Sequence, residues 1–214
     1  DDKNVNITQV AEQLGVSIST VSRILNGKAK EYRISEETQK KVNAFVKKMG
    51  YTPNLMARTL RLKKSFTIAL VIPDITNTFF SSIAKTIEQK ARQQGYSIIL
   101  CDSDGNTEKE INDIENMKHR MVDGFIIAPV GETSLHIENL LKQKIPTVVI
   151  DRYFKNKPIP FVASDNFKGA YDATSFLIQN GHSNIACIQG LPFSQPNIER
   201  IAGYKKALSD HHIK

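Results

Sequence analysis

The chain has 214 residues, of which 40% are hydrophobic and 24% charged, a balance typical of a soluble globular protein with room for one core and a small extra module. Its longest apolar stretches, such as "IALVI" and "GFIIAPV", are far too short to cross a bilayer, which argues against a membrane protein. The net charge of +7 lies entirely in the first third: residues 1–65 hold 13 Lys and Arg against 6 Asp and Glu, whereas residues 66–214 hold 16 of each. Lys and Arg gain affinity for phosphates by releasing counterions, so a basic module on a neutral body favours a polyanion partner over a merely solvated surface.

The compartment is indicated by the cysteines and by the start of the sequence. Cys101 and Cys187 each lie inside an apolar, β-like run, and we predict that both are buried, reduced thiols. The polar start "DDKNVN" shows no secretory signal. We therefore expect a cytoplasmic protein.

The first third predicts three short helices. Residues 7–14 place apolar side chains at the i, i+3, i+4, i+7 spacing of one helical face, and Gly15 closes that helix. Ser17 or Ser19 can cap a second helix that ends at the next glycine. A third helix, within residues 35–50, carries acidic residues at its start and lysines at its end, which suits the helix dipole.

The first two helices fit a helix-turn-helix. The small Ala11 falls where the helices touch, and Gly15 falls in the turn. An Arg on the outer face of the second helix can donate two hydrogen bonds to guanine, while hydroxyls reach phosphates. The alternative is an ordinary three-helix bundle with a solvated polar face; helical spacing and charge segregation together favour a DNA-reading helix. Its outer face carries Ile18, Ser19, Ser22 and Arg23.

A basic segment, "TPNLMARTLRLKKS" at residues 52–65, separates the first third from the body. Pro53 breaks it from the preceding helix, and its leucines and methionine make it too apolar for a plain linker. A short helix that orders only against a partner explains this composition. A simple spacer is the alternative.

The body alternates strand and helix patterns. The runs "FTIALVIP", "YSIILCDS", "DGFIIAPV" and "IPTVVID" are typical of strands buried on both faces, and amphipathic stretches at residues 77–95, 106–121 and 133–144 lie between them. This alternation predicts parallel βαβ units in a doubly wound α/β fold. A further βαβ unit is expected from "FVASD" through "SNIACIQG" to a helix starting near Asn197, as the beginning of a second lobe.

Candidate ligand-binding residues fall where the predicted strands end. Ligands of open α/β sheets bind outside the carboxyl ends of the strands. Carboxylates and guanidinium groups suit hydroxyl groups, which both donate and accept, and aromatic faces suit the apolar face of a sugar ring. Phe79 or Phe80 could instead belong to the core, and Asp102, Asp104 or Asp165 could cap helices. The candidates are Asp74, Asn77, Phe79, Phe80, Asp102, Asp104, Asp151, Arg152, Asp165 and Arg200.

The segments "ITQVAEQLGVSISTVSRILNG" and "RISEETQKKVNAFVKKMGYTPNLMARTLR" resemble the DNA-binding end of lactose-repressor (LacI/GalR) family transcription regulators. The resemblance continues through "DITNTFF", "VDGFIIAP", "VASDNFKGAYDATSFLIQNGHSNIACIQG" and "ERIAGYKKAL". It implies a homodimer that reads a near-palindromic operator in double-stranded DNA. It also implies a body like periplasmic sugar-binding proteins, with the second lobe incomplete in this chain.

By position, the resemblance implies roles for particular residues. Base edges would be read by Ile18, Ser19 and Arg23. Phosphates, or docking of the helix, would be served by Ser17, Thr20, Ser22 and Asn26. The minor groove would be faced by the hinge residues Asn54, Ala57 and Leu60, with Leu60 as an apolar wedge and Arg58 and Arg61 on phosphates. Ile18 stands where some members have a polar base reader, so the operator sequence cannot be copied from relatives. The "NTFF" and "IDR" segments and Arg200 are similar to ligand positions of ribose-type sugar-binding proteins and repressors, so we expect a small sugar or related polyhydroxyl effector. The effector residues that this likeness implies are Asn77, Phe79, Phe80, Asp151, Arg152, Asp165 and Arg200.

These observations predict four regions: a helix-turn-helix domain (1–51), a hinge (52–65), the first lobe of the effector-binding core (66–160) and the start of the second lobe (161–214). We expect a DNA-binding transcriptional regulator, with repression favoured, whose operator affinity a small effector controls. No cofactor, metal or catalysis is expected, because the sequence has no GxxxxGK[ST] loop, HExxH or nucleophile elbow. The alternatives are a sugar-binding transport-type protein and a regulator controlled by a protein partner.

Overall fold

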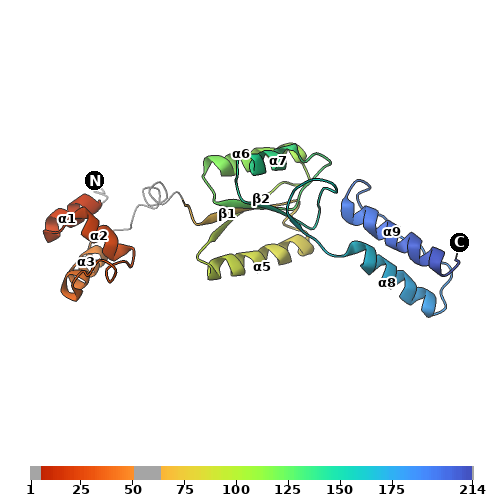
Figure 1. The fold of residues 1–214 in the computed structure, drawn as a ribbon, viewed down its shortest axis with the longest axis horizontal. Coiled ribbons are helices and arrows are strands. Elements are labelled where there is room, and N and C mark those ends of the chain that lie inside the picture. The colour runs from red at the N-terminus through yellow and green to blue at the C-terminus, as the bar shows by residue number, and fades with distance from the viewer. Residues whose placement is uncertain (1–5, 51–63, 214) are drawn as a thin grey trace. The chain divides into compact units, whose positions relative to one another are not determined.

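The computed structural model describes residues 6–50 and 64–213. The chain folds as two compact units, residues 1–63 and 64–214 (Figure 1). The finer division of the body at residue 160 stays a prediction.

Unit 1 contains the three predicted helices, α1 (Ile7–Leu14), α2 (Ile18–Leu25) and α3 (Glu36–Lys48). A capping box starts α1, because Asn6 and Gln9 each accept a hydrogen bond from the other's backbone N–H. Gly15 adopts the left-handed conformation with φ 63° and ends α1, so the chain turns directly into α2. Ser17, one of the two predicted caps, begins α2.

The core of unit 1 joins all three helices and the loop before α3. Apolar side chains from each helix meet in one cluster, which fixes the direction of the remaining faces. The fully or nearly buried members are Val10, Ala11, Val21, Ile24, Ala29 and Val42.

Unit 2 is built on a five-stranded parallel sheet in the order β2-β1-β3-β4-β5, as the predicted βαβ alternation requires. The order runs in opposite directions from β1, which creates a crevice at the carboxyl ends of the strands. The strands are β1 (Thr67–Ile72), β2 (Ser97–Asp102), β3 (Gly124–Ile127), β4 (Thr147–Ile150) and β5 (Phe161–Val162).

Helices cover both faces of this sheet, which makes it doubly wound (Figure 1). α5 (Thr78–Gln93) lies on one face, and α6 (Thr107–His119) and α7 (Leu135–Lys142) lie on the other. Alternate residues of β1 serve the two faces: Leu70 packs with Phe80 of α5, whereas Val71 packs with Ile114 of α6.

The last helices, α8 (Asn166–Gln179) and α9 (Gln195–Asp210), pack side by side (Figure 1). The strand predicted at "SNIACIQG" is wrong: residues 183–190 have no regular structure. A strand needs a neighbour to hydrogen-bond, and none of the described strands pairs with this run. Consequently Cys187 is exposed, contrary to prediction, whereas Cys101 is buried as predicted.

Two strands differ from expectation in their surroundings. β5 pairs with β4 in the same sheet, although "FVASD" was expected to open a second βαβ unit. β2 lies at an edge, so Leu100 is 41% exposed and the strand is not buried on both faces. Apolar composition alone does not distinguish an edge strand from a central one.

Candidate functional site

The amino end of α2 is organised by hydroxyl groups. Ser17 Oγ accepts a hydrogen bond from the Thr20 backbone N–H at 3.1 Å. The same hydroxyl lies 2.7 Å from Ser19 Oγ and 2.8 Å from Thr20 Oγ1. At the other end, the Asn26 amide donates to the Ser22 carbonyl oxygen at 2.6 Å. Ser17 and Asn26 therefore hold the two ends of the helix. Their contact with phosphates, or their role in docking the helix, stays a prediction.

The outward face of α2 presents the residues expected to read DNA. The buried Val21 and Ile24 anchor the opposite face in the core. Ile18 is 47% exposed, Ser19 is exposed, and Arg23 is half-buried. This face combines an apolar group, a hydroxyl and a guanidinium, which are the chemistries that contact a thymine methyl, a phosphate and a guanine.

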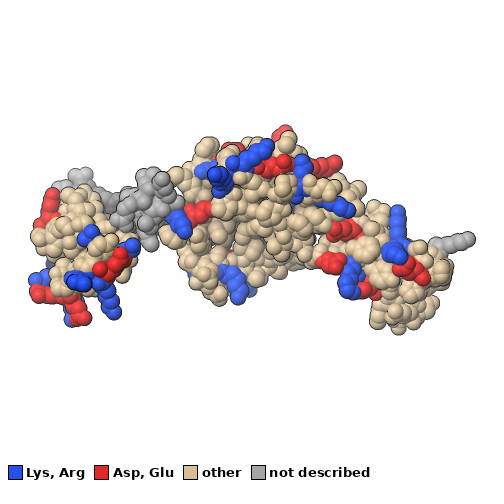
Figure 2. Space-filling model, viewed as in Figure 1, with Lys and Arg blue, Asp and Glu red and all other residues tan. Residues whose placement is uncertain are grey.

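Charge on unit 1 is mixed where it is visible. Figure 2 shows acidic side chains among the Lys and Arg of this unit on the face drawn. Several of the basic residues counted in the first third, and all five predicted hinge contacts, lie outside the described residues. Those hinge contacts are Asn54, Ala57, Arg58, Leu60 and Arg61.

In unit 2, a cavity of about 370 Å³ lies at the carboxyl edge of the sheet. It brings together residues from the start of α5, the segment that follows β4, and the start of α9 with the loop before it. Its wall includes six of the seven predicted effector residues, Asn77, Phe79, Phe80, Asp151, Arg152 and Arg200, together with Gly190, Leu191, Ser194, Pro196 and Asn197.

Asp151 and Arg152 form the charged part of this wall. Burial raises the pKa of Asp151, although the guanidinium groups of Arg152 and Arg200 oppose that shift. Burial lowers the pKa of Arg152, against the effect of Asp151. Arg152 also donates a hydrogen bond from Nη1 to the Pro129 carbonyl oxygen at 3.4 Å. A half-buried acceptor beside a half-buried donor can bind hydroxyl groups, which both donate and accept.

The two phenylalanines differ in role. Phe80 is 4% exposed and belongs to the core beneath the cavity, as the alternative interpretation anticipated. Phe79 is 48% exposed and meets Phe80 edge-on, with ring centroids 5.1 Å apart. Asn77 caps α5 by accepting from the Phe79 N–H at 3.0 Å. Phe79 is thus the more exposed of the two rings on the cavity wall.

Asp165 does not line this cavity. It caps α8, accepting from the Lys168 backbone N–H at 2.9 Å, so the capping alternative describes its contact in the structure. The predicted cap of α6 by Asp102 or Asp104 is wrong, because Asn106 caps that helix. Asp74 accepts from the backbone and hydroxyl of Thr76 in a tight turn.

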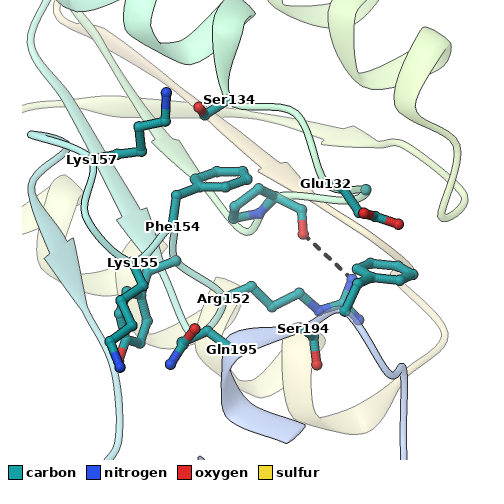
Figure 3. A pocket seen from close by; sticks show the side chains of 12 residues that line it. Glu132, Ser134, Arg152, Phe154, Lys155, Lys157, Ser194 and Gln195 are labelled. Atoms are coloured by element: carbon teal, nitrogen blue, oxygen red, sulfur yellow. Dashed lines mark hydrogen bonds between the residues drawn. The ribbon is translucent and has the colours of Figure 1, made fainter. Parts of the chain in front are cut away.

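A neighbouring cavity of about 260 Å³ shares Arg152 with the first (Figure 3). Lys155 and Lys157 lie on its wall, and Lys157 Nζ is 2.9 Å from Glu138 Oε1. The loop after β3 forms another side and is fixed by the fully buried Glu110. One Glu110 oxygen accepts from the Val130 N–H at 2.9 Å, and the other lies 2.7 Å from His136 Nε2.

Sequence reasoning missed several polar residues that shape the site. Arg200 Nε donates to Asn166 Oδ1 at 2.9 Å, which fixes the arginine that lines the cavity. Asn197 accepts from the Gly190 N–H at 2.8 Å. Both asparagines are nearly buried, at 5% and 7% exposure, and no local spacing distinguishes them from helix-start residues.

The described residues contain no group of three His, Cys, Asp or Glu side chains placed to hold a metal ion. Within the same residues, no helix is long and apolar enough to span a membrane.

A helix-turn-helix unit joined to a parallel α/β body with a cavity at the sheet's carboxyl edge defines a class of two-part helix-turn-helix proteins. Residues 6–54 match the bacterial regulatory proteins of the lacI family, and residues 65–214 match the periplasmic binding proteins and sugar binding domain of the LacI family. The chain belongs to the LacI family.

Named relatives agree with this assignment. Catabolite control protein A of Priestia megaterium is 38% identical over 209 residues, which cover 97% of this chain and 62% of the relative. The ribose operon repressor of Halalkalibacterium halodurans is 37% identical over 207 residues, covering 97% and 60%. The crystal structure of the lac repressor dimer bound to operator and the anti-inducer ONPF superposes with a TM-score of 0.86 at 27% identity, covering 99% of this chain and 64% of that one. The chain thus spans about 60–62% of the length of these curated relatives.

Proposed function

We propose that this protein is a sequence-specific DNA-binding transcriptional regulator, acting as a repressor, whose operator affinity is controlled by a small effector. The observation that carries the proposal is the outward face of α2, where Ile18, Ser19 and Arg23 stand opposite a core-anchored face. That arrangement is the one by which a recognition helix enters the major groove. Relatives named as repressors, and a lac repressor dimer bound to operator among the similar structures, support the same function and a homodimer.

Arg23 is proposed as the principal base reader. Arg23→Ala is expected to relax base preference at one symmetric operator position, at a cost of about 1–3 kcal/mol per contact, because a bidentate contact to guanine is lost. Fluorescence anisotropy with operator and base-substituted duplexes measures this preference. Lys48→Ala, which removes an exposed charge at the end of α3, is the control and should leave base preference unchanged. A uniform loss of affinity for all duplexes in Arg23→Ala would make Arg23 a phosphate contact.

The hinge role of Leu60 follows from family resemblance. Leu60→Ala should weaken binding to the operator and leave non-specific binding nearly unchanged, because an apolar wedge contributes only where the duplex is kinked. Equal operator affinity in the variant and the parent protein would reduce the segment to a spacer.

The effector is proposed to be a small sugar held at the cavity of about 370 Å³. A Cra regulator from Pseudomonas putida, solved in complex with fructose 1-phosphate, superposes with a TM-score of 0.63 at 25% identity over 67% of this chain and 54% of that one. Titration calorimetry with a panel of pentoses, hexoses and their phosphates tests the proposal. For any sugar that binds the parent protein, Arg152→Ala should abolish binding. Lys155→Ala should preserve it, because Lys155 lines only the neighbouring cavity of about 260 Å³.

The alternatives make different predictions for the same experiments. A transport-type sugar-binding protein would bind a sugar without reading DNA, and the regulatory-family match of residues 6–54 disfavours it. A regulator controlled by a protein partner would bind DNA and respond to none of the sugars. The named relatives are regulators and repressors, so we infer no catalytic role and a cytoplasmic location.

A further inference from the structure

The loop between α2 and α3 places an aromatic ring against the predicted base reader. The guanidinium carbon of Arg23 lies 3.8 Å from the centroid of the Tyr32 ring, close enough for a stacked cation–π contact. Among the described residues, this ring is the partner that the structure gives to the Arg23 guanidinium. Tyr32 is 44% exposed, so the loop holds much of a large aromatic side chain at the surface rather than in the core.

The backbone that carries Tyr32 is firmly held. The Tyr32 N–H donates to the Lys28 carbonyl oxygen at 3.2 Å, and the Ile34 N–H donates to the Ala29 carbonyl oxygen at 2.9 Å. Ala29 is buried in the core of unit 1, and Ile34 packs against that core. A loop tied by its own hydrogen bonds and by two apolar anchors gives the backbone of Tyr32 a defined position.

The loop is also joined to both helices that flank it. The Lys28 N–H donates to the Arg23 carbonyl oxygen at 2.9 Å, so the start of the loop is hydrogen-bonded to the backbone of Arg23. The Gln39 side chain of α3 donates to the Ile34 carbonyl oxygen at 2.8 Å. Contacts within unit 1 therefore position the backbones of both Arg23 and Tyr32.

The stack leaves the arginine able to act. A guanidinium group presents its N–H donors in its own plane, at the edge, whereas a cation–π contact uses the face. An arginine stacked on a ring can therefore still offer a two-pronged edge to guanine. A free arginine loses considerable rotamer freedom when it binds, and prior placement reduces that cost.

From these observations we propose that Tyr32 is a positioning residue for DNA recognition: its ring holds the Arg23 guanidinium in the orientation that reads a base. This inference rests on the proposed function, since it needs Arg23 to contact a base. Tyr32 itself acts through Arg23, and its effect is confined to the operator position that Arg23 reads.

The test uses the full-length protein and three duplexes: the operator enriched from random DNA, the same operator with the Arg23 position substituted, and a random-sequence duplex. Tyr32→Ala is expected to reduce discrimination between the first two about 2- to 5-fold per half-site, the size of an exposed cation–π contact. Affinity for the random duplex should stay the same. Tyr32→Phe keeps an aromatic face and should restore discrimination.

The double variant separates positioning from a general structural effect. In the Arg23→Ala background, Tyr32→Ala should produce no further loss of discrimination, because there is no guanidinium left to position. Amide exchange in α1 and α3 checks that unit 1 keeps its stability in each variant. An equal loss in both backgrounds would overturn the proposal.

Three other results would also contradict it. Discrimination that is unchanged in Tyr32→Ala, while Arg23→Ala relaxes it, refutes the positioning role and leaves the proposed function intact. Increased discrimination in Tyr32→Ala would mean that the ring competes with DNA for the arginine. Unchanged base preference in Arg23→Ala would refute the base-reading role of Arg23 and, with it, the role of Tyr32.

Discussion

Replacement of Glu110 tests how the loop after β3, on the wall of the cavity of about 260 Å³, is held. The Glu110 side chain is fully buried on α6 and makes two hydrogen-bond contacts, with the Val130 N–H at 2.9 Å and with His136 Nε2 at 2.7 Å. Glu110→Ala removes the carboxylate and leaves both the Val130 N–H and His136 Nε2 without this partner. A buried donor left without an acceptor costs about 1–3 kcal/mol, and breaking a buried pair costs about 3–5 kcal/mol. We expect the free energy of unfolding of unit 2 to fall by about 3–5 kcal/mol.

Hydrogen–deuterium exchange of the β3 amides measures this loss within unit 2 alone, without a contribution from unit 1. Two variants calibrate it. Glu110→Gln keeps an acceptor for the Val130 N–H and should lose only about 1–2 kcal/mol. Asn112→Ala changes an exposed residue of the same helix and should stay within about 0.5 kcal/mol. If Glu110→Ala exchanged like Asn112→Ala, the buried contacts would contribute nothing measurable and the reasoning would be refuted.

Two further predictions concern the second half of the body. A Cβ added at Gly203 would lie 2.2 Å from the Phe167 carbonyl oxygen, so Gly203→Ala should destabilise the α8–α9 pair by about 1–3 kcal/mol, as measured by amide exchange. Gly169→Ala is the control, because the space around Gly169 is open, and it should be neutral or stabilising. Equal effects of the two substitutions would contradict the packing argument. The hydrogen bond from the Tyr153 hydroxyl to Glu199 raises the pKa of Tyr153 from 10.0 to about 12. The protonated tyrosine therefore stabilises the folded state fully below about pH 10, and this contribution is lost as the pH rises toward about 12. Glu199→Gln should return this tyrosine toward its ordinary pKa in an ultraviolet titration, and an unchanged titration curve would count against the assigned cause.

Local sequence patterns predicted the helices and strands that neighbouring residues in the chain determine. The apolar spacing of residues 7–14 and the left-handed Gly15 give α1 and its turn, and Ser17 gives the start of α2. The apolar runs predicted four strands of the parallel sheet, because short β-branched runs bounded by turn residues are typical of strands, at the edge of a sheet as well as inside it. Six effector candidates lie on one cavity because parallel strands end at the same edge.

The features that the sequence did not reveal depend on distant contacts. Residues 183–190 have the composition of a strand, yet strand formation requires a hydrogen-bonding neighbour. The hydrogen bond from Arg200 to Asn166 joins residues on two different helices. The Tyr32 stack on Arg23 depends on the path of a turn-rich loop. No periodic pattern in the sequence indicates either the Arg200–Asn166 hydrogen bond or the Tyr32–Arg23 stack.

Selection of the full-length protein against random duplex DNA, followed by sequencing, tests the central claim most directly. The proposed function predicts enrichment of a near-palindrome with a flexible central step, because a dimer presents two α2 helices and the hinge residues kink the centre. Arg23→Ala should lose preference at one symmetric position of that palindrome. No enrichment, or only a salt-sensitive preference for any duplex, would contradict the assignment of α2 as a recognition helix.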